Sequence, residues 1–102
     1  MYHFGQCEQC GQGLRGIRAC ASGRHFLILC DECEAMWFTL EDNGPTYLKQ
    51  PELPCPACGA SLMQPPARWA TLPEIRDVGW ENELCGEIRG REDASPSDTT
   101  KT

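Results

Sequence analysis

Six of the eight cysteines in this 102-residue chain stand in CxxC pairs. Two thiolates three residues apart can bind one ion from a single tight turn, whereas disulfide frameworks usually spread their cysteines to close longer loops. A chain of this length also builds only a modest apolar core, so it needs a disulfide or a metal ion to stabilise its fold. The pattern therefore favours metal over disulfides. The pairs are Cys7/Cys10, Cys30/Cys33 and Cys55/Cys58, and the single cysteines are Cys20 and Cys85.

The first two pairs have the spacing of a zinc site. Nineteen residues separate Cys10 from Cys30, within the C-x₂-C-x₁₅₋₂₀-C-x₂-C pattern. A structural Zn²⁺ is tetrahedral and takes four protein ligands, so each CxxC needs a second pair. A rival pairing of Cys30/Cys33 with Cys55/Cys58 has workable spacing too. We expect one Zn²⁺ bound by Cys7, Cys10, Cys30 and Cys33.

The residues between these pairs predict a β-hairpin whose open end the metal clamps. Residues 14–21 and 24–29 have the composition of strands, with Ser22-Gly23 as the tight connection. A third strand is expected at residues 36–40, paired with residues 46–49. The fold class is therefore a small metal-stabilised β-rich domain, a zinc ribbon with a third knuckle and one short C-terminal helix.

The rest of the chain is expected to complete a single domain over residues 1–89. A capping box of Thr71 and Glu74 predicts a helix from Leu72 to Val78, ending at Gly79. Leu72, Ile75 and Val78 then share one face, and Trp69 and Trp80 fold the helix back onto the ribbon. The expected parts are a ribbon core (7–41), a third CxxC knuckle (51–66), a short helix (71–79) and a disordered tail (90–102).

The third pair, Cys55 and Cys58, needs two more ligands to form a second zinc site. With Ser22-Gly23 at the centre of the hairpin turn, Cys20 lies across from His25 on the same face. Cys20 and His25 would then complete the site, and Cys85 with either of them is an alternative. A lone cysteine or histidine is also common as an ordinary packed residue, and the pair itself could be oxidisable.

One resemblance covers about residues 7–41. The arrangement Cys7-x₂-Cys10-x₃-Leu14, a hairpin, then Cys30-x₂-Cys33-x₃-Trp37-Phe38-x₂-Glu41 resembles the transcription factor IIB-type zinc-ribbon family found in many small bacterial proteins. The resemblance implies a ribbon fold and assigns the four ligands to the same cysteines. The chain departs from the family pattern at Phe38 and Thr39, where the family has Leu and Asp. Because zinc ribbons serve as binding modules, enzyme appendages and nucleic-acid readers, the resemblance transfers little function.

The net charge and the lack of targeting signals in the sequence narrow the range of expected partners and locations. The formal charge is -6, and four thiolates around Zn²⁺ add further negative charge, which disfavours binding of the whole chain to nucleic acid or anionic membranes. The N-terminus has no basic stretch followed by an apolar one, so no signal peptide is visible. No apolar run is long enough to span a membrane. We expect a cytoplasmic protein.

We expect a non-enzymatic protein-interaction module, because four-thiolate zinc has no open position for an activated water. It would act as an adaptor, a regulator or a small acidic inhibitor of the immunity type. Trp37, Trp69 and Trp80 are candidate partner contacts. The alternative is a nucleic-acid-binding ribbon that uses the hairpin arginines. Those arginines are Arg15, Arg18 and Arg24, and they are candidate partner contacts as well.

Overall fold

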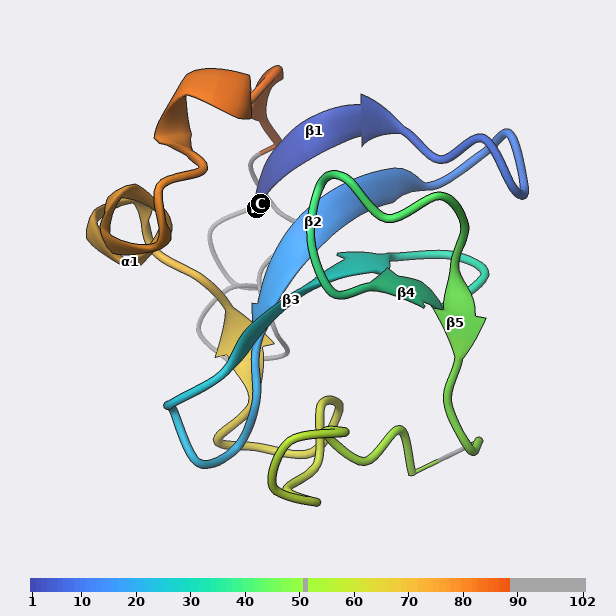
Figure 1. Cartoon of the computed structure of the whole chain (residues 1–102), viewed down its shortest axis with the longest axis vertical. Helices are drawn as coiled ribbons and strands as arrows, with labels where there is room; N and C mark the ends of the chain where they lie inside the picture. The colour runs from blue at the N-terminus through green and yellow to red at the C-terminus, as the bar shows by residue number, and fades with distance from the viewer. Residues whose placement is uncertain (51, 89–102) are drawn as a thin grey trace, which may run out of the picture.

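The computed structural model describes residues 1–50 and 52–88, and it confirms a small antiparallel β-rich domain with one short helix (Figure 1). Its sheet has the strand order β5-β4-β3-β2-β1-β7, and β6 pairs with β2. The predicted tail, residues 90–102, lies outside the described residues. The elements are β1 (Tyr2–Gln6), β2 (Leu14–Ala19), β3 (Phe26–Cys30), β4 (Ala35–Trp37), β5 (Thr46–Tyr47), β6 (Arg68–Trp69), α1 (Leu72–Val78), the 3₁₀ turn η1 (Glu81–Glu83) and β7 (Gly86–Glu87).

The predicted hairpin is present as β2 and β3, and it forms the centre of the sheet. Ile17 lies opposite Ile28, and the backbone N–H of Cys20 donates to the carbonyl of His25 at 3.0 Å. The predicted register is therefore correct, but the connection is wider than a two-residue turn. The N–H of Gly23 donates to the carbonyl of Cys20, and Gly23 has a φ of 77°, so residues 21–24 form the loop.

The sheet is buried on both faces, which is unusual because antiparallel sheets often leave one face to water. Successive residues of β3 alternate between two cores: Ile28 joins the first, whereas Leu27 and Leu29 join the second. β4 divides in the same way, with Trp37 in the first core and Met36 in the second. Each face therefore needs its own covering segment.

The helix α1 covers the first face. Its buried residue Ile75 packs into the first core with Phe4 and Ala70, and the ring of Phe4 meets that of Trp80 edge-on at 6.0 Å. Trp80 thus holds the helix against the sheet as expected. Trp69 does not, because it packs against the second core instead.

Sequence rules predicted α1 to the residue. Thr71 and Glu74 form the capping box, and Gly79 ends the helix in the left-handed region at a φ of 87°. The predicted apolar face is correct only for Ile75, because a two-turn helix presents one position to the sheet; Leu72 is half-buried and Val78 is exposed. In the described part of the chain, no helix is long and apolar enough to cross a bilayer.

Two strand predictions need correction. The third strand ends at Trp37 and not at Leu40, because the Asp42 carboxylate accepts the N–H of Phe38 at 2.7 Å and the hydroxyl of Thr39 at 3.1 Å, which turns the chain. Its pairing with β5 is as expected. The N-terminal strand β1 was not predicted, although Tyr2 and Phe4 alternate with polar residues.

We predict that replacing Glu74 by alanine lowers the free energy of unfolding by about 1 kcal/mol. The Glu74 carboxylate pairs with Arg68 at 2.6 Å and accepts the N–H of Thr71 at 2.9 Å, and these two contacts lower its pKa to about 2. Urea unfolding of the metal-loaded protein at pH 7 measures the change. Glu83→Ala, an exposed acid, is the control, and equal stability of the two variants would contradict the assignment.

Candidate metal centres

Two groups of four side chains in the described residues can each hold a metal ion. In each group, the candidate ligand atoms all lie within 4.8 Å of one another. All eight cysteines are free thiols, so neither group is a disulfide cluster. The first cluster consists of Cys7, Cys10, Cys30 and Cys33, and the second consists of Cys20, His25, Cys55 and Cys58.

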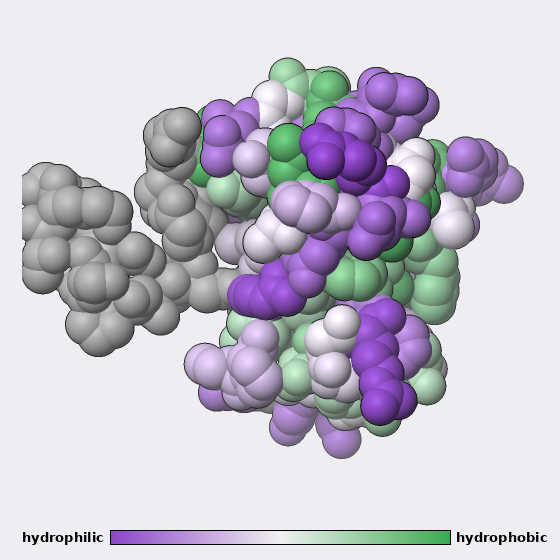
Figure 2. All heavy atoms as spheres, turned by 90° about the vertical axis from the view of Figure 1, so that its left-hand side faces the viewer, coloured by the Kyte–Doolittle hydropathy of each residue, from purple (hydrophilic) through white to green (hydrophobic). Residues whose placement is uncertain are grey.

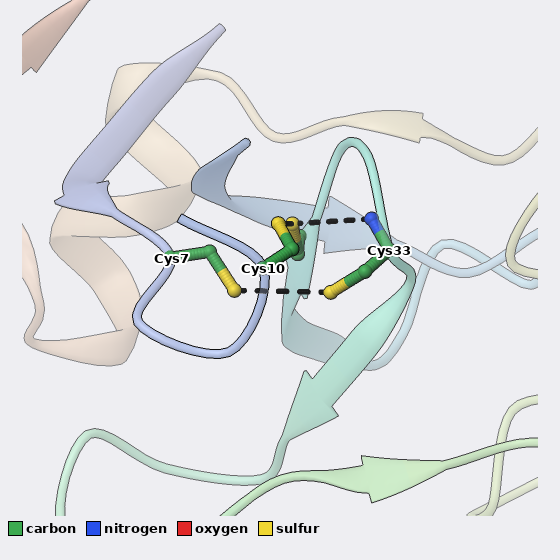
Figure 3. Close-up of side chains that lie close together, drawn as sticks. Cys7, Cys10 and Cys33 are labelled. Carbon is green, nitrogen blue, oxygen red and sulfur yellow. Dashed lines mark hydrogen bonds between the residues drawn. The ribbon is translucent and has the colours of Figure 1, made fainter. Parts of the chain in front are cut away.

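The first cluster lies at the open end of the β2–β3 hairpin. Cys7 and Cys10 stand on the turn between β1 and β2, which the N–H of Cys7 closes by donating to the carbonyl of Gly13 at 2.8 Å. Cys30 ends β3, and Cys33 stands on the turn before β4. Figure 3 shows the Cys7 side chain pointing across the gap toward Cys33. This is the grouping that the cysteine spacing predicted.

The sulfur–sulfur distances fit a tetrahedral ion. Four sulfurs at about 2.3 Å from one tetrahedral ion lie about 3.8 Å from one another. The Sγ atoms of Cys7 and Cys33 are 3.8 Å apart, and those of Cys10 and Cys30 are 3.7 Å apart. The thiols therefore already stand close to the corners of a coordination tetrahedron.

The second cluster lies at the opposite end of the hairpin and joins it to a separate loop (Figure 1). Cys20 and His25 flank the hairpin turn, as their register predicted. Cys55 and Cys58 come from residues 53–62, which we call the knuckle loop. The Sγ of Cys20 lies 3.8 Å from the Sγ of Cys58 and 3.7 Å from Nδ1 of His25, so His25 offers Nδ1 as its ligand atom.

The knuckle loop is irregular, as expected for a third CxxC knuckle. The N–H of Cys55 donates to the carbonyl of Ala60, and that of Gly59 donates to the carbonyl of Cys55, both at 2.7 Å. The N–H of Leu62 closes the loop on the carbonyl of Leu53 at 2.9 Å. The loop therefore closes on itself through these backbone bonds and presents two thiols from one tight turn.

Nearby donors and burial shift the thiol pKa values in opposite directions. Backbone N–H groups, chiefly that of Gly13, lower the pKa of Cys10 to about 6, whereas burial raises the pKa of Cys30 to about 12. Burial also works to raise the pKa of Cys20, but hydrogen bonds from Ser22 and His25 outweigh it and lower that pKa to about 5. Because metal binding needs thiolates, an ion entering the first cluster must displace the proton of Cys30.

The alternative ligand sets are not the ones that the structure brings together. Cys30/Cys33 and Cys55/Cys58 belong to different clusters, which rules out the rival pairing. Cys85 is exposed and belongs to neither, because it follows η1 and pairs by its N–H with the carbonyl of His3 at 2.9 Å. Cys85 thus stays beside β1, and the knuckle loop meets the hairpin turn instead.

The predicted arginine patch is wrong for Arg18. This side chain is only 3% exposed, donates from Nε to the carbonyl of Leu62 at 2.6 Å and lies 4.8 Å from the ring centre of Trp69. Arg15 is half-buried and donates to the carbonyl of Phe4 at 2.7 Å. Arg24 is exposed. Strand alternation explains the difference, since Arg18 faces the second core and meets the knuckle loop there.

The three tryptophans do not form a shared contact surface. Trp37 is 9% exposed and belongs to the first core, so it packs beneath the surface. Trp69 and Trp80 are half-buried, against the second and the first core respectively. The tryptophans are therefore largely the core that a chain of this size needs.

A cavity of about 100 Å³ beside the first cluster could not be seen in the sequence. Ile28, Trp37 and Leu40 form its apolar wall, and Arg15 reaches it from β2. The Nε atom of Arg15 is buried, and no described residue accepts a hydrogen bond from it. The loop after β4 closes over this cavity. The cavity therefore depends on the tertiary fold and could not be predicted from local sequence patterns. Gln9 and Asn43 add amide groups, and Glu8, Thr39, Asp42 and Gly44 complete the lining.

We predict that Cys33→Ser removes one metal equivalent per chain and unfolds the hairpin, because the first cluster links the start of β2 to the end of β3. Cys85→Ser is the matched control and should keep the metal content and the circular dichroism spectrum of the parent. Metal analysis after gel filtration under reducing conditions measures the first effect. Equal metal content in the two variants would rule out Cys33 as a ligand.

Comparison with known proteins found no relative of this chain. No protein-family model, no curated protein and no solved structure matches the chain. What the two clusters do is therefore argued from this chain's own residues.

Proposed function

We propose that the chain is a non-enzymatic protein that binds two structural Zn²⁺ ions and serves as a protein-interaction module. Thiolate and imidazole are the ligands that zinc takes in structural sites. Each cluster offers four side-chain ligands, which close the tetrahedron and leave no position for an activated water. The ions then act as staples for the fold, and the surface carries the function.

The need for a staple is largest at the knuckle loop. Its buried side chains, Leu53 and Leu62, contribute about 1.5–3 kcal/mol each. Ordering the backbone of residues 53–62 costs about 1–2 kcal/mol per residue, which exceeds that gain. A structural Zn²⁺ contributes about 10–16 kcal/mol, which is about the difference. The energetics thus support an ion in the second cluster as well as in the first.

The hairpin with the first cluster fits the zinc ribbon that the sequence resembles. Two CxxC knuckles flank β2 and β3, and Trp37 follows the second knuckle into the core. On this proposal, the ribbon is the scaffold, and β1, α1 and the knuckle loop are additions that cover its two faces.

The observation that carries the interaction role is the cavity beside the first cluster, which is lined by Arg15, a side chain whose Nε is buried without an acceptor among the described residues. A buried donor that lacks an acceptor costs about 1–3 kcal/mol, so an acceptor from a partner would relieve that cost. The apolar wall of the cavity suits a small side chain next to that acceptor. Phe38, which is 46% exposed, follows the wall residue Trp37 and supplies apolar surface for contact.

The proposed surface lies on the loop between β4 and β5, away from α1 (Figure 1). On the α1 side, the hydrophobic areas are small and are interrupted by strongly hydrophilic side chains (Figure 2). Tyr47 on the edge strand β5 is 57% exposed and extends the apolar surface near the first cluster. A partner that binds here would therefore contact the loop, the cavity and the sheet edge.

Nucleic-acid binding has less support than protein binding. With Arg18 buried and Arg15 committed to the carbonyl of Phe4, Arg24 is the exposed member of the hairpin set. One exposed arginine on the hairpin of a chain of formal charge -6 provides few phosphate contacts. The interaction proposal therefore takes precedence over the nucleic-acid one.

We predict that Arg15→Lys weakens partner binding about tenfold or more, because lysine keeps the charge but loses the Nε donor and the planar guanidinium beside the cavity. The partner is first captured by crosslinking from an extract of the source organism, and its affinity is then measured by calorimetry. Arg24→Lys is the control for a conservative change at an exposed arginine. Capture of no stoichiometric protein, together with salt-sensitive binding of mixed oligonucleotides, would overturn the proposal in favour of nucleic acid.

A further inference from the structure

The two clusters connect different parts of the molecule. The first lies at the open end of one hairpin, and its ligands belong to the turn before β2, the end of β3 and the turn after β3. The second takes Cys20 and His25 from the hairpin turn and Cys55 and Cys58 from the knuckle loop. An ion in the second cluster is therefore a bridge between the sheet and a segment that lies outside it.

Without that bridge, apolar packing and hydrogen bonds hold the knuckle loop on the sheet. Leu53, Cys55 and Leu62 belong to the second core, and the loop's carbonyls accept hydrogen bonds from β2 and the turn after it. The donors are Nε of Arg18, to Leu62 at 2.6 Å, and the N–H of Ala21, to Ser61 at 2.8 Å. The N–H groups of Cys55, Gly59 and Leu62 bond within the loop, and that of Leu53 donates to the carbonyl of Lys49 at 2.7 Å. A loop that loses its hold on the sheet loses these short-range bonds as its backbone disorders.

The rest of the fold does not depend on the knuckle loop. The first core contains Ile17, Ile28 and Ile75 together with two ligands of the first cluster, and no residue of the knuckle loop belongs to it. The ladder of β1 to β4 and the packing of α1 are likewise made by other segments. Loss of the loop would therefore leave one complete core and one complete metal cluster in place.

The second cluster is also the more accessible of the two. Its ligand Cys58 is exposed, whereas each ligand of the first cluster is buried or half-buried. A competing chelator or thiol reagent can thus reach an ion in the second cluster first. The two clusters differ in what they hold and in how readily they release it.

We propose that the second cluster is a metal-operated latch, which holds the knuckle loop on the sheet when an ion is bound and frees it when that ion is lost. This inference rests on the proposed zinc binding. Release uncovers Leu27, Leu29 and Met36 on the second face, while the first cluster and α1 stay folded. The chain then has two folded states that differ in one face of the sheet.

Hydrogen–deuterium exchange on the full chain tests the latch with Cys58→Ser, using Cys85→Ser as the matched cysteine control. The informative amides are those of Ala21, Cys55, Gly59 and Leu62, which all donate within the loop or to it. In Cys58→Ser, these amides should exchange at least about 100-fold faster, whereas the β2–β3 ladder amides should change less than about threefold. The protein should retain one zinc per chain.

Two results would overturn the latch. Equal loss of protection in the β2–β3 ladder would mean that the chain unfolds as one unit, and unchanged protection of the knuckle loop would mean that the ion does not hold it. Should Cys58→Ser fail to fold, the same exchange measurement on the parent protein after stepwise chelation to one zinc gives the same decision. A parent protein that binds no zinc would refute the proposed function itself and not the latch alone.

Discussion

Four ligands can surround one tetrahedral ion only if the chain brings them within about 3.8 Å of one another, and this requirement shapes the whole fold. The two CxxC turns of the first cluster meet because β2 and β3 form a hairpin that returns the chain to its starting point. The second cluster uses the other end of the same hairpin. One supersecondary element therefore positions both candidate metal centres, and its register determines which residues meet at each.

The two centres also explain how a short chain buries both faces of its sheet. Residues of β3 and β4 alternate between two cores, and each core includes two cysteines of one cluster: Cys7 and Cys30 in the first, and Cys20 and Cys55 in the second. The first core gains the helix α1, which supplies its own regular structure. The second is covered by the irregular knuckle loop together with Leu48 and Trp69, so a bound ion would contribute more to its stability.

Local sequence rules predicted much of this arrangement. The CxxC spacing predicted the first group of four, the turn at Ser22-Gly23 placed Cys20 opposite His25, and the capping box of Thr71 and Glu74 fixed α1. These features depend on residues close in sequence or on one strand register. They could be read without knowing the tertiary fold.

Features that depend on packing between distant segments could not be predicted in this way. The strand β1 is stabilised by β2 and β7 and not by its own composition, and β6 and β7 are two residues long. Arg18 looks like a surface charge in the sequence, but the knuckle loop and Trp69 bury it.

Native mass spectrometry of the zinc-loaded, reduced protein tests the central claim most directly. The account predicts a monomer with two zinc ions, whereas a monomer with one or none, or zinc ions present only in a dimer, would contradict it.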